Sequence, residues 1–312
     1  MNILSDVILP AGRSAMDLCL FVLLPVMVVM LTIMRLLEAR GVIEWLVTRL
    51  APLLHPFGLT GLGVFAALQI NLVSFAAPVA TLAIMEQRGT SNRHLAATLA
   101  MVLAMAQANT SFPLGAMGLN LGPVLLYSVI GGLVAAAATY YGFGRSLSAE
   151  EHLVDDLPRH GEAEGTKGVL DVINRAGAEA FKITIGAIPL LILSLVAVTA
   201  LRHGGAIDGL TRLLGPIMAA VGIDTALILP TFTKYLAGGT AMMGAMDTML
   251  RQGQITVELL NHSAGFLVHP MDLPGVAVLI SSGKRVAGVW KPAVFGSLVG
   301  IAVRTVAHIW LI

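Results

Sequence analysis

An aspartate, a lysine and two histidines stand inside stretches that are otherwise apolar. Asp272, His269 and His262 lie in "NHSAGFLVHPMDLPG", and Lys234 lies in "LPTFTKYLAGGT". A charged side chain in the middle of a bilayer costs about 2.5–3.5 kcal/mol, so Lys234 and Asp272 are expected to pair and cancel in charge. Two interpretations remain open: a structural ion pair, or a site in which Asp272 and His269 titrate or bind a solute while Lys234 orders them. His262 is either an interior histidine or a member of a proton relay.

Neutral polar side chains accompany prolines and glycines in the same kind of stretch. Irregular backbone deep in a membrane is tolerated only when it is buried in protein or faces water. Such side chains suit a polar solute or, with freed carbonyl oxygens, Na⁺, while the alternative is hydrogen bonding between helices. We predict that four breaks converge on one polar chamber, with these candidate binding residues: Gln69, Asn71, Ser74, Asn109, Thr110, Ser111, Thr231, Thr233, Lys234, His269 and Asp272.

Other kinds of chemistry find little support in the sequence. The chain has no GxxxxGK[ST], HExxH or paired CxxC spacing, and its net charge of +1 does not indicate a nucleic-acid partner. The single cysteine, Cys19, cannot form an intrachain disulfide and is expected to be a small packing residue. We therefore expect no enzyme activity, no metal site and no cofactor, with H⁺ or Na⁺ as the candidate coupling ion.

The elements that position these residues are helices in a bilayer. Of the 312 residues, 56% are hydrophobic and only 12% are charged, against about a quarter charged in soluble domains. Several apolar runs approach the length of about 20 residues that a helix needs to cross a bilayer. The sequence therefore predicts an all-α polytopic membrane protein whose surroundings are lipid.

Several short motifs of the first half of the sequence recur in the second half. Thr48-Arg49-Leu50 recurs as Thr211-Arg212-Leu213, and Pro123-x4-Ser128-x2-Gly131 recurs as Pro292-x4-Ser297-x2-Gly300. Matches that recur in order indicate an internal duplication. We predict a first transmembrane repeat at 1–143, a polar linker at 144–182 with a surface helix in its second part, and a second repeat at 183–312.

Each half reads as an initial span, an amphipathic segment, a broken apolar segment, a second broken segment and a final span. The first broken segment, Leu59–Gln87, either crosses the membrane or returns as a re-entrant hairpin. A hairpin places most basic residues and the linker on one side, so the positive-inside rule favours it, with the linker cytoplasmic. The model is then two inverted repeats, each with three crossings, an amphipathic helix and a hairpin. It leaves few basic residues outside: Arg13, Arg202, Arg212 and Arg251.

The paired breaks resemble those of the nucleoside-recognition, or Gate, domain membrane proteins, including the spore-maturation A and B type proteins. The lines that carry the resemblance are "LQINLVSFAAPVATLAIM" and "LAMAQANTSFPLGAMGLNLG" in the first half, with "LPTFTKYLAGGTAMMGAM" and "HSAGFLVHPMDLPG" in the second. More distantly the chain is similar to the concentrative nucleoside transporters. The resemblance implies broken helices and re-entrant hairpins in a multi-pass protein of the bacterial inner (plasma) membrane. The nucleoside transporters place a glutamine, a glutamate and a proline close together in the first hairpin. Here Gln69 and Pro78 are nine residues apart, and no glutamate lies between them.

Two functions from different classes fit these features. The first is a secondary transporter, coupled to H⁺ or Na⁺, for a small polar solute such as a nucleoside or a related metabolite. The second is a non-transporting membrane scaffold or regulatory subunit that keeps the transporter architecture. A scaffold gains nothing from polar breaks at one depth in both halves, and an intramembrane enzyme lacks a recognisable nucleophile or metal constellation. The sequence leaves open whether the chain forms a homo-oligomer.

Overall fold

The computed structural model describes residues 4–150, 168–220 and 223–310, and within these ranges every regular element is a helix. The predicted all-α class is confirmed. The helices of these ranges that are long and apolar enough to cross a bilayer are Leu4–Ala39, Asn92–Ala116, Leu121–Phe143, Val169–Leu201 and Trp290–Trp310. The sixth predicted crossing corresponds to α13 and α14, which are short helices separated by a break, so the number of crossings stays a prediction.

Both halves place their elements in the same order. The first half contains α1 (Leu9–Asp17), α2 (Leu24–Ala39), α3 (Val42–Leu54), α4 (Gly61–Leu72), α5 (Pro78–Gln87), α6 (Asn92–Ala104), α7 (Ala108–Ala116) and α8 (Leu121–Ala137). The second contains α9 (Val169–His203), α10 (Ala206–Ala220), α11 (Ile228–Ala237), α12 (Gly239–Arg251), α13 (Val257–Leu267), α14 (Leu273–Ile280), α15 (Lys284–Gly288) and α16 (Trp290–Trp310). A long helix, an amphipathic helix, two helix pairs and a final span thus occur twice. The inverted orientation of the halves stays a prediction.

The two final spans, α8 and α16, pack closely where the repeat places equivalent glycines. A Cβ on Gly300 would lie 2.2 Å from the Gly131 carbonyl oxygen, and a Cβ on Gly131 would lie 2.8 Å from the Gly300 carbonyl oxygen. Small residues let membrane helices approach to backbone contact. The contact is reciprocal between equivalent residues, as at a two-fold interface.

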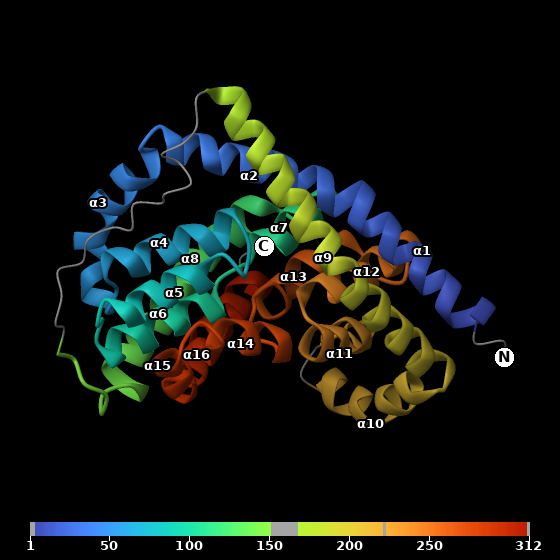
Figure 1. Cartoon of the computed structure of the whole chain (residues 1–312). Coiled ribbons are helices and arrows are strands. Elements are labelled where there is room, and N and C mark those ends of the chain that lie inside the picture. The colour runs from blue at the N-terminus through green and yellow to red at the C-terminus, as the bar shows by residue number, and fades with distance from the viewer. Residues whose placement is uncertain (1–3, 151–167, 221–222, 311–312) are drawn as a thin grey trace.

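The long helices form a layer of their own. In Figure 1, α9 runs beside α2 and α1 and covers one side of the broken helices. Helix α3 meets α4 at a bend of 105°, so the two do not form one straight span. Large apolar side chains such as Phe21 and Leu193 remain about two-thirds or more exposed on this layer, as expected for a surface that faces lipid.

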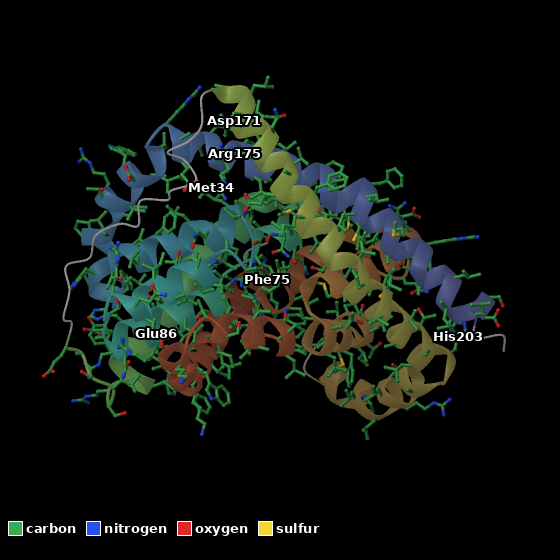
Figure 2. All side chains as sticks on the ribbon, in the orientation of Figure 1. Met34, Phe75, Glu86, Asp171, Arg175 and His203 are labelled. Carbon is green, nitrogen blue, oxygen red and sulfur yellow. The ribbon has the colours of Figure 1, made fainter. Side chains whose placement is uncertain are left out.

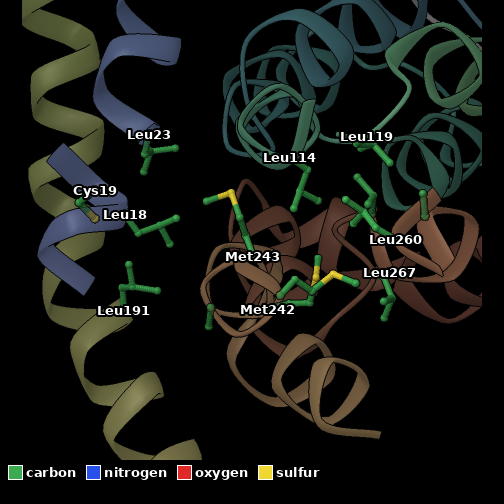
Figure 3. Packing of buried hydrophobic residues seen from close by; sticks show 14 of the residues in the cluster. Leu18, Cys19, Leu23, Leu114, Leu119, Leu191, Met242, Met243, Leu260 and Leu267 are labelled. Carbon is green, nitrogen blue, oxygen red and sulfur yellow. The ribbon is translucent and has the colours of Figure 1, made fainter. Parts of the chain in front are cut away.

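Apolar packing joins this layer to the broken helices. Figure 3 shows Leu18 and Leu23 of the first helix and Leu191 of α9 pointing toward Met243 of α12. All four side chains are at least nine-tenths buried, as is Cys19, the predicted packing residue. Because buried side chains pack closely, this contact sets the distance between the long helices and the broken helices.

The predicted linker overlaps a helix. Helix α9 begins at Val169 and continues without interruption to His203, so Val169–Lys182 is helical, as expected, yet it extends the following span. Most of the remaining linker, 151–167, lies outside the described residues. The predicted repeat boundaries stay predictions.

Candidate solute-binding cavity

Each hairpin has a break between its helices. Helix α4 ends at Leu72, residues 73–77 form turns, and α5 begins at Pro78, whose ring cannot continue a helix from the preceding turn. In the second hairpin, α11 and α12 are separated only by Gly238, which has a φ of +91°. This backbone conformation favours glycine.

These breaks are shorter than predicted. The sequence predicts that Leu68–Pro78 and Thr231–Thr240 are non-helical hairpin tips. This is wrong for Leu68–Leu72 and Thr231–Ala237, and also for Pro78, Gly239 and Thr240, which belong to the following helices. The polar side chains there bond inside their own helix, since Asn71 Nδ2 donates to the Ala67 carbonyl (3.3 Å) and Thr233 Oγ1 to the Leu229 carbonyl (2.8 Å). Polar residues satisfied in this way do not interrupt the helix.

The second helix pair of each half is also broken. Residues 105–107 separate α6 from α7, and residues 268–272 separate α13 from α14. Asp272 is the N-cap of α14, because its Oδ1 accepts the Gly275 N–H (2.7 Å).

All of these breaks border one cavity of about 560 Å³. The hairpins contribute Phe75 and Ala76, and Ala237 to Ala241, while the other two breaks contribute Gln107, Asn109 and Asp272 together with Pro274 and Gly275. Phe75 lies near the middle of the molecule in Figure 2. The long helices complete the wall with Leu23, Glu179, Lys182, Ile183, Gly186 and Leu191. The predicted convergence of four breaks on one chamber is therefore what the structure shows.

Lys234 and Asp272 form an ion pair. Lys234 Nζ donates to Asp272 Oδ2, and both side chains are almost fully buried. The carboxylate thus serves two elements at once, since its other oxygen caps α14. The pair ties the second hairpin to the break between α13 and α14.

His269 is engaged by the backbone. Its Nε2 lies 2.9 Å from the Phe266 carbonyl oxygen, and its Nδ1 accepts the Met271 N–H at 3.2 Å. These partners fit the tautomer that carries its proton on Nε2. His269 is fully buried and is not among the residues that line the cavity.

Of the predicted site residues, the structure places Asn109 and Asp272 on the cavity wall. Asn109 Oδ1 accepts the Phe75 N–H (3.2 Å), which holds the first hairpin against α7. The others do not line this cavity, and several bond elsewhere: Gln69 accepts from Thr81 (2.7 Å), Asn71 accepts from Ser128 (2.8 Å), and Ser111 donates to the Gln107 carbonyl (3.0 Å). Ser74 and Thr110 are buried, and Thr231 is partly exposed.

Other polar side chains on the cavity wall are not among the binding residues predicted from the sequence. Gln107 is the N-cap residue of α7, and Thr240 is the second residue of α12. Glu179 and Lys182 come from the predicted linker. Glu179 is held by Arg35 of α2 (2.8 Å), whereas no pairing of Lys182 occurs in the part of the chain that the structure describes.

Arg304 of α16 is completely buried and does not extend to the membrane surface. Its guanidinium donates to the Ala104 carbonyl, where α6 ends, and to the Val268 carbonyl (3.0 Å), just after α13. Helix C-termini leave carbonyl groups without intrahelical partners. One side chain therefore donates to one carbonyl at the break of each helix pair.

Residues 20–143 match the family described as Gate, nucleoside recognition. This stretch is similar to the Gate domain. The predicted resemblance is thus confirmed for most of the first repeat. No curated protein matches the sequence significantly.

The fold is that of the concentrative nucleoside transporters. CNTnw in an inward-facing, substrate-bound state matches with a TM-score of 0.68 over 92% of this chain and 74% of its own, at 20% identity. A doubly substituted variant of CNTnw in an outward-facing state gives 0.68 over 92% and 75%, at 18% identity. With its apolar helices, the chain is therefore a multi-pass membrane protein with a transporter-like fold.

Proposed function

We propose that this protein is a secondary transporter that binds a small polar solute in the cavity between the four helix breaks. A nucleoside or a related metabolite is the first solute to test, and H⁺ or Na⁺ is the coupling ion. The protein acts as a multi-pass protein of the bacterial inner membrane.

The observation that carries the proposal is the convergence of all four breaks on one cavity. Broken helices near the bilayer midplane are where secondary transporters bind their solutes. A volume of about 560 Å³ falls within the usual range for small-molecule sites. A scaffold would need neither the cavity nor the loss of helical hydrogen bonds at each break.

Solute counterflow into proteoliposomes of the purified chain tests this function. Candidate solutes are first chosen by thermal shift, because a ligand that binds only the folded state raises apparent stability. We expect counterflow of at least one stabilising solute. We also expect uptake of that solute to depend on a proton or sodium gradient. Stabilisation without counterflow would favour the regulatory alternative.

A matched pair of variants on α12 ties transport to the cavity. Thr240 lines the cavity, whereas Thr248 on the same helix donates to the Gly244 carbonyl (3.0 Å) away from the wall. Thr240→Val should reduce uptake by about tenfold, as expected when one polar partner of a bound solute is lost. Thr248→Val should transport like the unaltered chain.

A further inference from the structure

The cavity wall contains more N-terminal than C-terminal ends of the broken helices. Its polar wall is built from the beginnings of helices: Gln107 before α7, Gly239 to Ala241 in α12, and Asp272 before α14. The ends of α4, α6 and α13 do not line it, and of the helix ends only Ala237 of α11 does. Because a helix N-terminus carries partial positive charge, these helix ends contribute positive potential to the wall.

Buried side chains add charge of the same sign. Among the described residues, the fully or nearly fully buried charged side chains are Lys234, Arg304 and Asp272, so cations outnumber carboxylates. Lys234 and Asp272 pair with each other, and no described carboxylate pairs with Arg304. Arg304 also donates to one carbonyl at the end of α6 and to one just after α13, and its positive charge offsets the negative ends of these helices.

One of these N-termini is open. Asp272 caps α14, but no side chain caps α12, whose N-cap residue is Gly238. The first N–H groups of a helix have no intrahelical partner. Gly239, Thr240 and Ala241 supply these groups in α12, and all three line the cavity.

Two unpartnered side chains stand against the same turn. Gln107 is 2% exposed and lines the cavity, and the described chain supplies no hydrogen bond to its side-chain amide. A Cβ on Gly239 would lie 2.0 Å from Gln107 Nε2 and 2.9 Å from Thr110 Oγ1. The Thr110 hydroxyl is buried without a partner. Glycine at 239 thus leaves room for an amide and a hydroxyl beside the open helix terminus.

We propose that Gly239, Thr240, Ala241 and Gln107, which all line the cavity, form an anion cradle that binds a carboxylate or phosphate group of the transported solute. Backbone N–H groups, an amide and a hydroxyl can all donate to one oxyanion. Elsewhere on the cavity wall, Glu179 is held by Arg35 and Lys182 adds a further cation. The inference rests on the proposed function and specifies its substrate class as anionic.

Matched probes that differ in one charged group test the cradle on the purified full-length chain. Titration calorimetry compares orotate with uracil for a carboxylate, and uridine 5′-monophosphate with uridine for a phosphate. Acetate and inorganic phosphate serve as the smallest anions. We expect at least one anionic member to bind ten times or more tightly than its neutral counterpart, and the pair that does so identifies the group.

Two variants place the anion at the cradle. Gly239→Ala should weaken binding of that anion about tenfold or more, because the new methyl group occupies the space between Gln107 and the helix terminus. Gly209→Ala is the matched control, since a Cβ there meets nothing within 4 Å. Gln107→Glu puts a like charge in the cradle and should abolish anion binding. Thermal unfolding of each variant without ligand separates loss of binding from loss of fold.

The outcomes separate this inference from the transport function. Neutral members that bind as tightly as their anionic partners, or tight anion binding that survives both Gly239→Ala and Gln107→Glu, would overturn the cradle and leave transport of a neutral solute standing. A chain that binds none of the anionic probes also overturns it. Anion binding at the cradle without counterflow would support the cradle and refute the transporter.

Discussion

At the scale of single residues, the cost of buried charge explains the pairing of Lys234 with Asp272. One carboxylate oxygen accepts from Lys234 on α11, and the other caps α14. Removing either partner strands the other in a nonpolar setting. The geometry alone is compatible with a structural pair and with a coupling site, and substitution separates them.

Asp272→Asn keeps the shape of the side chain but leaves Lys234 uncompensated. We expect a loss of about 3–5 kcal/mol in unfolding free energy. Adding Lys234→Met should recover most of that stability. Ion-coupled uptake in this double variant should remain absent if Asp272 couples transport. Full recovery of coupled uptake would instead assign the pair a structural role.

Arg304 serves two carbonyl groups that belong to different halves of the chain. Arg304→Met leaves the Ala104 and Val268 oxygens without this donor, at about 1–3 kcal/mol for each unsatisfied buried acceptor. Arg251→Met is the control, because the Arg251 side chain is 72% exposed and pairs with Asp247 on its own helix. Chemical unfolding in detergent measures both. Equal stability of the two variants would contradict the role given to Arg304.

At the scale of elements, proline and glycine mark three of the four breaks, whereas residues 105–107 contain neither and the nearby Pro113 lies inside α7. Pro78 begins α5 and Gly238 separates α11 from α12, as their backbone preferences require. Gln69 and Asn71 lie on α4, where they bond to Thr81 and Ser128. Which face of a helix meets the cavity depends on tertiary packing, which a single sequence does not show.

The crossing of α8 and α16 depends on glycine. Gly300→Ala would bring a methyl group to 2.2 Å from the Gly131 carbonyl, so the helices must separate. We expect a loss of about 1–3 kcal/mol in unfolding free energy, typical of overpacking. Gly288→Ala, where a Cβ meets nothing within 4 Å, should be neutral. A Gly300→Ala protein as stable as Gly288→Ala would mean that the helices do not touch at Gly131.

At the scale of the whole molecule, the duplication inferred from recurring motifs stays a prediction, whereas the membrane class could be predicted from the long apolar runs. The part played by α9 could not. Its first turns read as a polar linker, yet Glu179 and Lys182 line the cavity because α9 extends as one helix beside α2. Asp171 and Arg175 at one end of α9 and His203 at the other lie far from Phe75 in Figure 2. Only the middle of this helix reaches the site.

The orientation in the membrane follows from the basic residues near the ends of the spans. We expect a cysteine at Ser148, an exposed position after α8, to react with impermeant thiol reagents only from the cytoplasmic side. Cys19 is buried, and its replacement by alanine removes it as a background. Labelling of Ser148→Cys from outside intact cells would overturn the predicted topology.

The central claim is that the four breaks enclose a cavity in which a solute binds. Thr240→Cys in a Cys19→Ala background tests it most directly, with Met243→Cys on the same helix as a buried control. In proteoliposomes, we expect the cysteine at 240 to react with a water-soluble methanethiosulfonate reagent, and a stabilising solute to slow that reaction at least tenfold, while the cysteine at 243 stays unreactive. A cysteine at 240 that is unreactive, or that reacts at the same rate with and without solute, would contradict the account.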